Sequence, residues 1–481
     1  MINLANYKKI HCIGIGGIGL SAIAEIFLSR GYAVSGSDMR ESDITVRLIE
    51  RGASIFLGHR AKNVEEADLV VYTVAVGDDN PELARARELG IPTVTRAQVL
   101  GALMSEYEHS IAISGTHGKT TTTSMLSLIL KDAQKEPTIL VGGNLDEIGG
   151  NVYVGDGDYF VTEACEYRDS FLELRPSIEI ILNIDSDHLD YFKDLEHIVS
   201  SFDKFARLVP EDGVVIAYDA NPFVHSVIEE LTNAITFGLN SGNDYYAGNI
   251  NFDNEGMPSF DVYHKEERLG NIKLSVPGEH NILNALAAFA CGHVLGVEVD
   301  GIMNTLRKYT GIHRRFDILG RTDEDVKVID DYAHHPTEIK ATLAAIKKMK
   351  HNELWCLFQP HTYTRTMALM DDFAESFDEA DKVVLSEIYA AREKNIHRIS
   401  SNTLAEKIRE HNENIEVSFF EEFEDIACYV YENAREGDLV LTMGAGDIYK
   451  VGEMILEMDQ KAREARMRLS RKVREYKKIE D

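Results

Sequence analysis

Two glycine-rich turns are the features that most restrict the fold of this chain. The first, Gly14–Gly19, follows the apolar run Lys9–Ile15 and precedes a helical pattern. The second, Ser114–Thr120, follows the run Ser110–Ile113 and leads into a helical pattern that continues through Leu130. Strands that turn tightly into helices are typical of parallel sheets, because a crossover helix must precede the next parallel strand. We therefore predict an α/β fold.

The same alternation recurs along most of the 481 residues. At roughly 150 residues per domain, this length predicts about three domains. Further strands are expected at Ala33–Ser35, Leu69–Val74, Thr93–Thr95, Tyr159–Glu163, Ile178–Ile184, Gly213–Tyr218, Val326–Asp330, Glu353–Phe358, Lys382–Leu385 and Asp438–Thr442. Helices are expected at Ser21–Ser29, Pro81–Leu89 and Gly278–Leu295, and hairpins between Ala247 and Pro277. We place the domains at residues 1–106, 107–312 and 313–458, with a charged helical tail at 459–481.

The composition excludes several classes of function. Lys and Arg number 50 against 80 Asp and Glu, a net charge of −30 that repels nucleic acid. The five cysteines are scattered without a C-x-x-C pair, as in proteins of a reducing cytosol. Glycines and Glu25 interrupt Ile10–Leu28, which argues against a signal peptide, and no apolar stretch is long enough to span a membrane. We expect a cytoplasmic protein without nucleic-acid or membrane partners.

The tail Lys461–Asp481 has the opposite charge, with nine Lys or Arg against four Asp or Glu. A solvated terminal helix explains this pattern better than a binding arm does.

The first turn has the pattern of a site for a nucleotide diphosphate. Glycines let the backbone approach a diphosphate, and the N–H groups at a helix start attract its charge. A second strand ends at Ser35–Asp38, about twenty residues on, where a Rossmann domain places an acid that binds ribose. We expect a nucleotide diphosphate to be bound by Gly14, Gly16, Gly17, Ile18, Gly19, Ser37 and Asp38. A tight structural turn is the alternative.

The second turn resembles a P-loop, although its first glycine is displaced from the G-x-x-x-x-G-K-[ST] spacing. In such a loop the backbone N–H groups cradle phosphate, Lys119 reaches the terminal phosphates and the Thr120 hydroxyl binds Mg²⁺. The hydroxyl run Thr120–Ser124 is unfavourable in a helix, so a purely structural role explains the segment less well. ATP is therefore expected at Gly115, Thr116, His117, Gly118, Lys119, Thr120 and Thr121.

Acidic residues follow two further predicted strands, in the segments Glu163–Phe171 and Asn183–Asp190. Ligands bind at the carboxyl ends of strands in open α/β sheets, and Mg²⁺ prefers oxygen ligands. We predict metal ligation there. Glu163 and Glu166 are alternative carboxylate ligands at this point, and His188 is a further ligand. A solvated acidic loop is the alternative.

The segment Gly278–Asn281 precedes a helix rich in alanine. The amide of Asn281 can read the edge of a base, or these polar residues can simply cap the helix.

Five motifs together resemble the Mur ligase family. They are GTHGKT at Gly115–Thr120, NIDSDHLD at Asn183–Asp190, GEHNILN at Gly278–Asn284, HRRF at His313–Phe316 and DDYAHHP at Asp330–Pro336. Within that family the chain is most similar to the members that join L-alanine to UDP-N-acetylmuramate. The segments that carry this finer likeness are Gly14–Leu20, Ser35–Asp38, Phe358–Thr366 and Met443–Lys450. The likeness extends over residues 8–455.

The resemblance implies three domains: an N-terminal Rossmann-like unit for a UDP-sugar, a central P-loop ATPase-like domain and a C-terminal Rossmann-like α/β domain. It implies UDP rather than NAD at the first turn. ATP and Mg²⁺ are the implied cofactors, UDP-N-acetylmuramate and L-alanine the implied substrates, and an acyl phosphate the implied intermediate. A homodimer is compatible with the sequence, which does not determine the oligomeric state.

The resemblance also implies roles for single residues. It makes Glu166, rather than Glu163, the carboxylate ligand of a metal held with Thr120, and His188 the ligand of a second metal. The remaining positions are His280 and Asn281 near the adenine, Arg315 and Asp331 toward phosphate and ribose, and His335, His361 and Arg365 on the substrate side. The implied catalytic residues are Lys119, His188, Arg315, Asp331 and His335.

Two positions depart from the family pattern. Thr362 stands where many relatives have arginine, which leaves one substrate contact open. Phe202 stands where ligases that add later residues carry a carbamylated lysine, and Lys204 lies two residues away, so we expect no such lysine here.

Three other functions compete with this interpretation. A ligase of the same architecture would attach a preformed peptide instead of alanine. An NAD-dependent dehydrogenase would use Gly14–Gly19 and Asp38 but would leave Gly115–Thr120 unexplained. A nucleotide-gated sensor would bind ATP without net turnover.

Overall fold

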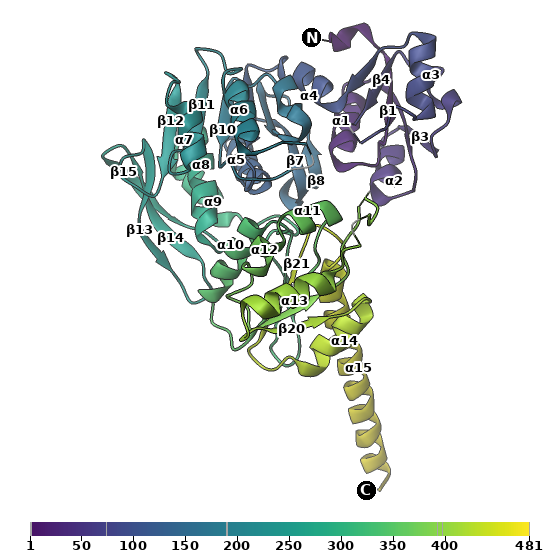
Figure 1. The fold of residues 1–481 in the computed structure, drawn as a ribbon, viewed down its shortest axis with the longest axis vertical. Helices are drawn as coiled ribbons and strands as arrows, with labels where there is room; N and C mark the ends of the chain where they lie inside the picture. The colour runs from purple at the N-terminus through teal and green to yellow at the C-terminus, as the bar shows by residue number, and fades with distance from the viewer. Residues whose placement is uncertain (1, 74, 189–190, 392, 397, 481) are drawn as a thin grey trace. The chain divides into compact units, whose positions relative to one another are not determined.

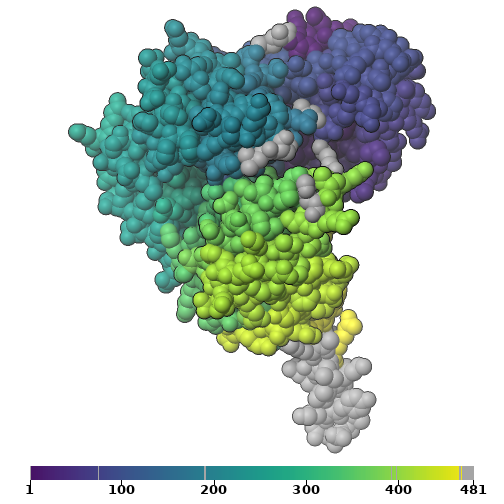
Figure 2. Space-filling model, in the orientation of Figure 1, coloured from purple at the N-terminus to yellow at the C-terminus, as the bar shows by residue number. Residues whose placement is uncertain are grey.

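The computed structural model describes residues 2–73, 75–188, 191–391, 393–396 and 398–480 (Figure 1), and the remaining residues are grey in Figure 2. Four residues of predicted segments lie outside these ranges: Val74, Leu189, Asp190 and Asp481. The chain forms two compact units, residues 1–250 with 260–272 and 282–309, and residues 251–259 with 273–281 and 310–481.

The first sheet has five parallel strands in the order β3-β2-β1-β4-β5. Its strands are β1 (Lys9–Ile13), β2 (Ala33–Asp38), β3 (Ser54–Leu57), β4 (Leu69–Tyr72) and β5 (Thr93–Thr95). Its helices are α1 (Ile18–Ser29), α2 (Asp43–Glu50), α3 (Pro81–Leu89), α4 (Arg96–Met104), η1 (Leu4–Asn6) and η2 (Ala61–Val64). This strand order is that of a Rossmann domain, which confirms the predicted N-terminal fold.

The second sheet has ten strands in the order β15-β14-β13-β12-β11-β10-β6-β9-β7-β8. The strands are β6 (His109–Ser114), β7 (Thr138–Leu145), β8 (Gly150–Tyr153), β9 (Tyr159–Glu163), β10 (Ile178–Ile181), β11 (Val214–Tyr218), β12 (Ala234–Gly238), β13 (Tyr245–Phe252), β14 (Pro258–His264) and β15 (Glu267–Lys273). The helices are α5 (Lys119–Asp132), α6 (Leu195–Ala206), α7 (Pro222–Ile228), α8 (Glu279–Val294), α9 (Val299–Lys308), η3 (Asp146–Ile148) and η4 (Tyr167–Glu173). Strand β6 pairs in parallel with both β9 and β10, so the carboxyl ends of these three strands are neighbours.

The third sheet has six strands in the order β16-β17-β21-β18-β19-β20, and only the β16–β17 pair is antiparallel. The strands are β16 (Asp317–Arg321), β17 (Lys327–Asp331), β18 (Leu354–Phe358), β19 (Lys382–Leu385), β20 (Glu416–Phe419) and β21 (Leu439–Met443). The helices are α10 (Pro336–Lys347), α11 (Tyr363–Ala368), α12 (Met370–Ala374), α13 (Ser401–His411), α14 (Phe423–Asn433) and α15 (Tyr449–Glu480). The C-terminal part of helix α15 is the charged tail that the sequence predicted to be helical (Figure 1).

The central strands are apolar along their length because helices cover both faces of a parallel sheet. In β18 all five residues are buried, and in β10 all four are. The alanine-rich helix α8 is buried for the same reason, with seven consecutive residues from Ala285 to Cys291 fully inaccessible. In the part of the chain that the structure describes, no helix is long and apolar enough to cross a membrane.

Candidate active site

The second glycine-rich turn, Ser114–Thr120, joins β6 to α5, as predicted. Gly115 and Gly118 have φ angles of +129° and +85°, which side chains rarely adopt. A Cβ atom on Gly118 would also lie 2.5 Å from the Oδ1 atom of Asn284 in α8. Lys119, Thr120 and the buried Thr122 lie in the first turns of α5. The first N–H groups of such a helix have no acceptor within the helix, which is the arrangement that a phosphate-binding loop requires.

Asn183, which follows β10, holds this loop in place through three hydrogen bonds. Its Oδ1 accepts from the backbone N of His117 (2.8 Å), its Nδ2 donates to the His117 carbonyl (3.1 Å), and its own carbonyl accepts from Thr116 N (3.2 Å). The Thr116 hydroxyl also accepts from the backbone N of Asp185 (2.9 Å). The NIDSDHLD segment thus supports the loop with its first residues, a role that we did not predict for Asn183.

Lys119 and Glu166 form a buried ion pair beside the loop. The Lys119 Nζ atom lies 3.0 Å from Glu166 Oε2 and donates to the carbonyls of Thr116 (3.0 Å) and Gly115. Burial acts to lower the pKa of Lys119, but the Glu166 charge, aided by Cys165 and Glu163, raises it above the ordinary value. The amine therefore stays an ammonium ion, the form that binds phosphate.

The residues expected to hold Mg²⁺ have a donor set that fits a hard cation. Glu166 is 3% exposed and lies 3.8 Å (Oε1) from the Nε2 atom of His188, and Thr120 is buried in the first turn of α5. Glu163 instead accepts a hydrogen bond from the backbone N of Gly142 (2.5 Å). The structure therefore groups Glu166 with Lys119 and His188 and directs Glu163 toward β7.

Strained backbone surrounds these acids. Arg168, Asp169 and His188 have φ angles of +55°, +55° and +54°, which cost about 1–3 kcal/mol each for residues other than glycine. The Asp169 carboxylate compensates by accepting hydrogen bonds from Tyr191 (2.6 Å) and Ser201. Strain held in this way is typical of a site that requires one geometry.

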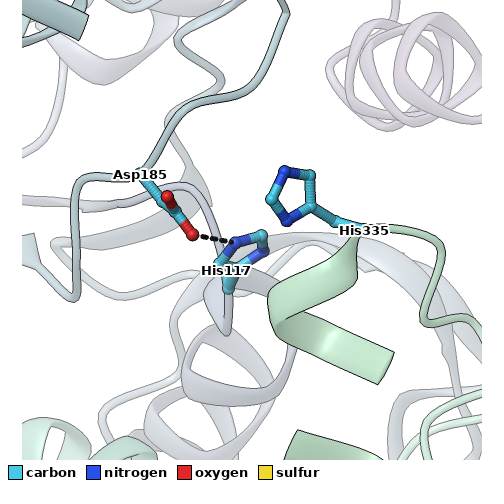
Figure 3. Close-up of side chains that lie close together, drawn as sticks. All are labelled: His117, Asp185 and His335. Atoms are coloured by element: carbon cyan, nitrogen blue, oxygen red, sulfur yellow. Dashed lines mark hydrogen bonds and ion pairs between the residues drawn. The ribbon is translucent and has the colours of Figure 1, made fainter. Parts of the chain in front are cut away.

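His117 and Asp185 form a further pair in the first unit. The Nε2 atom of His117 lies 3.4 Å from Asp185 Oδ2, and Figure 3 shows this ring directed at the carboxylate. In the second unit, His335 precedes α10, where Figure 3 draws it at the start of the helix. Its Nδ1 atom accepts from the backbone N of Thr337 (3.3 Å), so the ring caps the helix.

In the first sheet, the glycine turn is closed by the end of β2. The backbone N–H groups of Gly14 and Ile15 donate to the Ser37 carbonyl (2.8 and 3.0 Å), and Gly16 N donates to Asp38 Oδ2 (2.9 Å). Asp38 therefore braces the turn, and ribose binding by its carboxylate stays a prediction. Gly17 is the N-cap of α1, followed by Ile18 and Gly19 in the first helical turn.

A buried carboxylate network lies beside this turn, and the Asn-Pro-Glu start of a helix is its one signal in the sequence. Glu82 is fully buried and accepts from Ser37 Oγ (2.6 Å) and Asn63 Nδ2 (2.5 Å), with His59 Nδ1 at 3.2 Å and His11 Nε2 at 3.8 Å. Burial acts to raise the pKa of Glu82, but the nearby His11 ring and these hydrogen bonds lower it to about 2. The Ser37 side chain is thus engaged within the domain.

In the second unit, Asp331 ends β17 as a buried carboxylate. It accepts from the backbone N–H groups of Phe316 (2.8 Å) and Ala333 (2.7 Å). Burial raises the pKa of Asp331 to about 6, against the opposing charge of Arg315. Arg315 lies over the Tyr332 ring at 5.0 Å and 3.8 Å from Glu338 Oε1.

The predicted substrate-side residues His361 and Arg365 are in contact. The Nη1 atom of Arg365 donates to Nδ1 of His361 (3.3 Å), and the His361 ring stacks on Tyr389 at 5.6 Å. Thr362, between them in sequence, has a φ of +66°, an unusual angle for a β-branched residue. The segment after the carboxyl end of β18 therefore brings the Arg365 guanidinium group close to the rings of His361 and Tyr389.

The two residues expected near the adenine lie at the start of α8. His280 is half-buried, and burial together with the Arg315 charge lowers its pKa to about 4. Its ring is therefore neutral at pH 7. The Nδ2 atom of Asn281 donates to the Pro277 carbonyl (2.7 Å), so this amide holds the start of the helix against the preceding residues.

Comparison with known proteins identifies relatives along most of the chain. Residues 9–108 match the profile of the Mur ligase family, catalytic domain, residues 113–292 the Mur ligase middle domain, and residues 314–446 the Mur ligase, glutamate ligase domain. The chain is 52% identical to a UDP-N-acetylmuramate–L-alanine ligase from Clostridium botulinum (strain Loch Maree / Type A3) over 452 residues, which cover 94% of this chain and 98% of the relative.

Solved structures agree with this result. A UDP-N-acetylmuramate-alanine ligase from Thermotoga maritima superposes with a TM-score of 0.80 and 32% identity, covering 94% of this chain and 99% of that one. A murein peptide ligase from Psychrobacter arcticus superposes with a TM-score of 0.70 and 26% identity, covering 94% and 98%.

Proposed function

Because this chain belongs to the Mur ligase family, we propose that it joins L-alanine to the lactyl carboxylate of UDP-N-acetylmuramate, with release of ADP and phosphate from ATP. The observation that carries the proposal is the Lys119–Glu166 ion pair, which lies beside the glycine-rich loop at the carboxyl ends of the strands of the second sheet. The identity of 52% to a ligase with this activity supports the choice of substrates.

A carboxylate does not react with an amine directly, because its leaving group would be oxide. In the proposed reaction a carboxylate oxygen attacks the γ-phosphorus, the bond to ADP breaks, and an acyl phosphate forms. The neutral amine of L-alanine then attacks the acyl carbon, and inorganic phosphate leaves as the amide forms. No protein nucleophile is needed, so catalysis rests on positioning and on charge stabilisation.

The residues of this chain supply both. Two anions must meet, and the Lys119 ammonium ion together with the N–H groups of the Gly115–Lys119 loop would offset their repulsion. Thr120, Glu166 and His188 would hold Mg²⁺, which neutralises charge on phosphate oxygens when bound. Asp331, with a pKa near 6, is a candidate acceptor of the proton that the amine must lose.

The test is phosphate release with ATP, UDP-N-acetylmuramate and each amino acid in turn. We expect release only when all three substrates are present, and fastest with L-alanine among alanine, glycine and serine. ATP binding without any turnover would support a nucleotide-gated sensor instead, and phosphate release that does not require the UDP-sugar would contradict the ligase.

A second candidate is a ligase that attaches a preformed peptide to the same UDP-sugar. The observation in its favour is the superposition on the murein peptide ligase from Psychrobacter arcticus. The TM-score and identity of that match are lower than those of the match to the alanine ligase from Thermotoga maritima. Product analysis after incubation with equimolar alanine and a tripeptide separates the two, and we expect the alanine product to dominate.

A further inference from the structure

Asn151 is a buried amide in β8, at a place where the first and second sheets meet. The residue is 4% exposed and lies outside the motifs that resemble the Mur ligase family. Its Nδ2 atom donates to the Ile18 carbonyl (2.9 Å) at the start of α1, and its Oδ1 atom accepts from Arg47 Nη2 (3.4 Å) in α2. One side chain of the second sheet is therefore bonded to two helices of the first sheet.

A buried carboxylate holds Arg47 in this arrangement. The Arg47 Nε atom lies 3.2 Å from Glu25 Oε1, and Arg51 Nη1 lies 2.7 Å from the other oxygen of Glu25. Glu25 is 2% exposed and lies about two turns after Ile18 in α1. The contacts from Ile18 through Asn151 and Arg47 therefore return to the helix from which they begin. The Ile18 carbonyl requires a donor and the guanidinium group an acceptor, and a short carboxamide side chain supplies both.

A second set of contacts holds the other end of α1. Arg30, the C-cap residue, donates to Glu106 (2.5 Å) and to the Tyr107 hydroxyl (3.0 Å). That hydroxyl donates to Thr138 Oγ1 (3.0 Å) in β7. Helix α1 is thus connected to the second sheet at both ends, through Asn151 at its start and through Tyr107 at its end. Two separated attachments prevent the helix from sliding or turning on the sheet.

Paired strands connect Asn151 to the glycine-rich loop of the second sheet. Strand β8 pairs with β7, β7 with β9, and β9 with β6, which leads into the loop and Lys119. Each step across the sheet is fixed by the hydrogen bonds of a strand ladder. The position of Ile18 relative to Lys119 therefore depends on the sheet and on the Asn151 side chain.

The proposed reaction requires a fixed distance of this kind. The UDP-sugar is expected at the glycine turn of the first sheet and ATP at the loop of the second. The carboxylate oxygen must lie about 3–3.5 Å from the γ-phosphorus to react. A misplacement of about 1 Å, caused by a change far from the reacting atoms, can lower the rate about 10²-fold.

We propose that Asn151 is a positioning residue, which sets the distance between the bound UDP-sugar and ATP without contacting either of them. Both ends of its amide are engaged by groups of the protein, so it acts through the Ile18 carbonyl and Arg47. The inference rests on the proposed function and adds to it a residue outside the two ligand sites. Loss of the amide should leave each substrate bound and slow the step in which the two substrates meet.

The first measurement separates binding from turnover in Asn151→Ala. We expect wild-type Kd values, by calorimetry, for UDP-N-acetylmuramate and for a nonhydrolysable ATP analogue with Mg²⁺. We expect kcat to fall about 10- to 100-fold. Asn243→Ala is the matched control, because Asn243 is also buried but donates to the Asn240 carbonyl (2.9 Å) within its own domain. The control should keep the wild-type kcat.

The second measurement follows the geometry directly and needs no substrate. Spin labels are attached at Glu50→Cys in α2 and at Glu211→Cys between α6 and β11, which are exposed positions, after Cys428→Ser removes the exposed native thiol. We expect a narrow distribution of the distance between the labels in the protein that keeps Asn151 and in Asn243→Ala. The distribution should be broader or shifted in Asn151→Ala.

Asn151→Asp has the same shape but cannot donate to the Ile18 carbonyl. We expect it to lower kcat and to broaden the distance distribution as Asn151→Ala does. If Asn151→Ala does not fold, Asn151→Asp carries both measurements.

Three results would overturn the inference. They are a wild-type kcat in Asn151→Ala, a raised Kd for either substrate, which would mean that Asn151 acts on a binding site or on the fold, and a distance distribution identical to that of the protein that keeps Asn151. If the wild type binds both substrates but does not join alanine to the sugar, the proposed function fails, while the distances between the labels still test whether Asn151 holds the two domains together.

Discussion

The ammonium group of Lys119 lies 3.0 Å from a Glu166 carboxylate oxygen, although 47 positions separate the two residues in sequence. The pair forms because β6 and β9 are adjacent parallel strands, and each residue follows the carboxyl end of its strand. Both groups are expected to exchange this contact for ligand contacts, Lys119 with phosphate and Glu166 with Mg²⁺.

Lys119→Ala should lower kcat for phosphate release by at least about 10²- to 10³-fold, since one preorganised donor or cation is commonly worth about 3–4 kcal/mol. The control is Lys131→Ala, at the other end of the same helix, where the amine binds the Glu147 carbonyl. We expect the control to retain wild-type turnover and both proteins to show wild-type circular dichroism. Wild-type turnover in Lys119→Ala would contradict the ATP-site assignment.

Glu166→Gln should raise the Mg²⁺ concentration needed for half-maximal activity more than Glu163→Gln does. The reason is that Glu166 lies beside His188 and Lys119, whereas Glu163 accepts from the backbone of Gly142. A metal titration of the two isosteric variants gives the order directly. The reverse order would move the carboxylate ligand to Glu163.

The acid limb of the pH profile should depend on Asp331. Burial raises its pKa to about 6, so the carboxylate form accumulates as the pH rises from 5 to 7, and kcat/KM for L-alanine should rise with it. Asp331→Asn should remove this limb and lower kcat/KM about 10²- to 10⁴-fold, the range for loss of a general base. A limb that persists near pH 6 in Asp331→Asn would assign the proton to another group, and His335→Gln is the next variant to measure.

Glu82 should stabilise the first domain at neutral pH but not in acid. Its pKa is about 2 in the folded protein and 4.5 ordinarily, so the stabilisation is fully present above pH 4.5 and is lost as the pH falls toward 2. Glu82→Gln should reduce the free energy of unfolding at pH 7 by roughly 2–3 kcal/mol and have a smaller effect near pH 3. Urea unfolding at both pH values measures this difference.

The exposed Glu65, replaced by Gln, controls for the loss of one negative charge from the same domain. An equal loss of stability in both variants, or a loss in Glu82→Gln that does not depend on pH, would show that the Glu82 network does not act through ionisation.

The strands that the sequence predicted are mostly central ones, because a buried parallel strand is a continuous apolar run. Tyr159–Glu163 and Lys382–Leu385 have the predicted bounds. The edge strands β3 and β20 were missed, since β3 is largely exposed, β20 has only one buried residue, and neither is a continuous buried apolar run. The predicted strand Ile178–Ile184 ends earlier, at Ile181, because the chain turns there to bring Asn183 to the phosphate loop.

The glycine turns and strand-end acids were predictable because local chemistry requires those residue types at those places. Contacts made over long sequence distances were not. Glu82 reaches Ser37 across 45 positions, and nothing near Glu82 in sequence announces a buried acid. In the local sequence, Arg96 looks like any first residue of a helix. Its position beside Gly19 depends on how α1 and α4 pack. Such pairings follow from strand order, which motifs alone do not give.

Phe202 lies fully buried in α6, with its ring 5.2 Å from Phe171 at an angle of 81°, and the nearby Lys204 is exposed on the other side of the helix turn. An aromatic ring at this place cannot react with dissolved carbon dioxide as an amine would. The affinity of this protein for metal should therefore not depend on bicarbonate. Its rate of catalysis should be the same in buffers from which carbon dioxide has been removed.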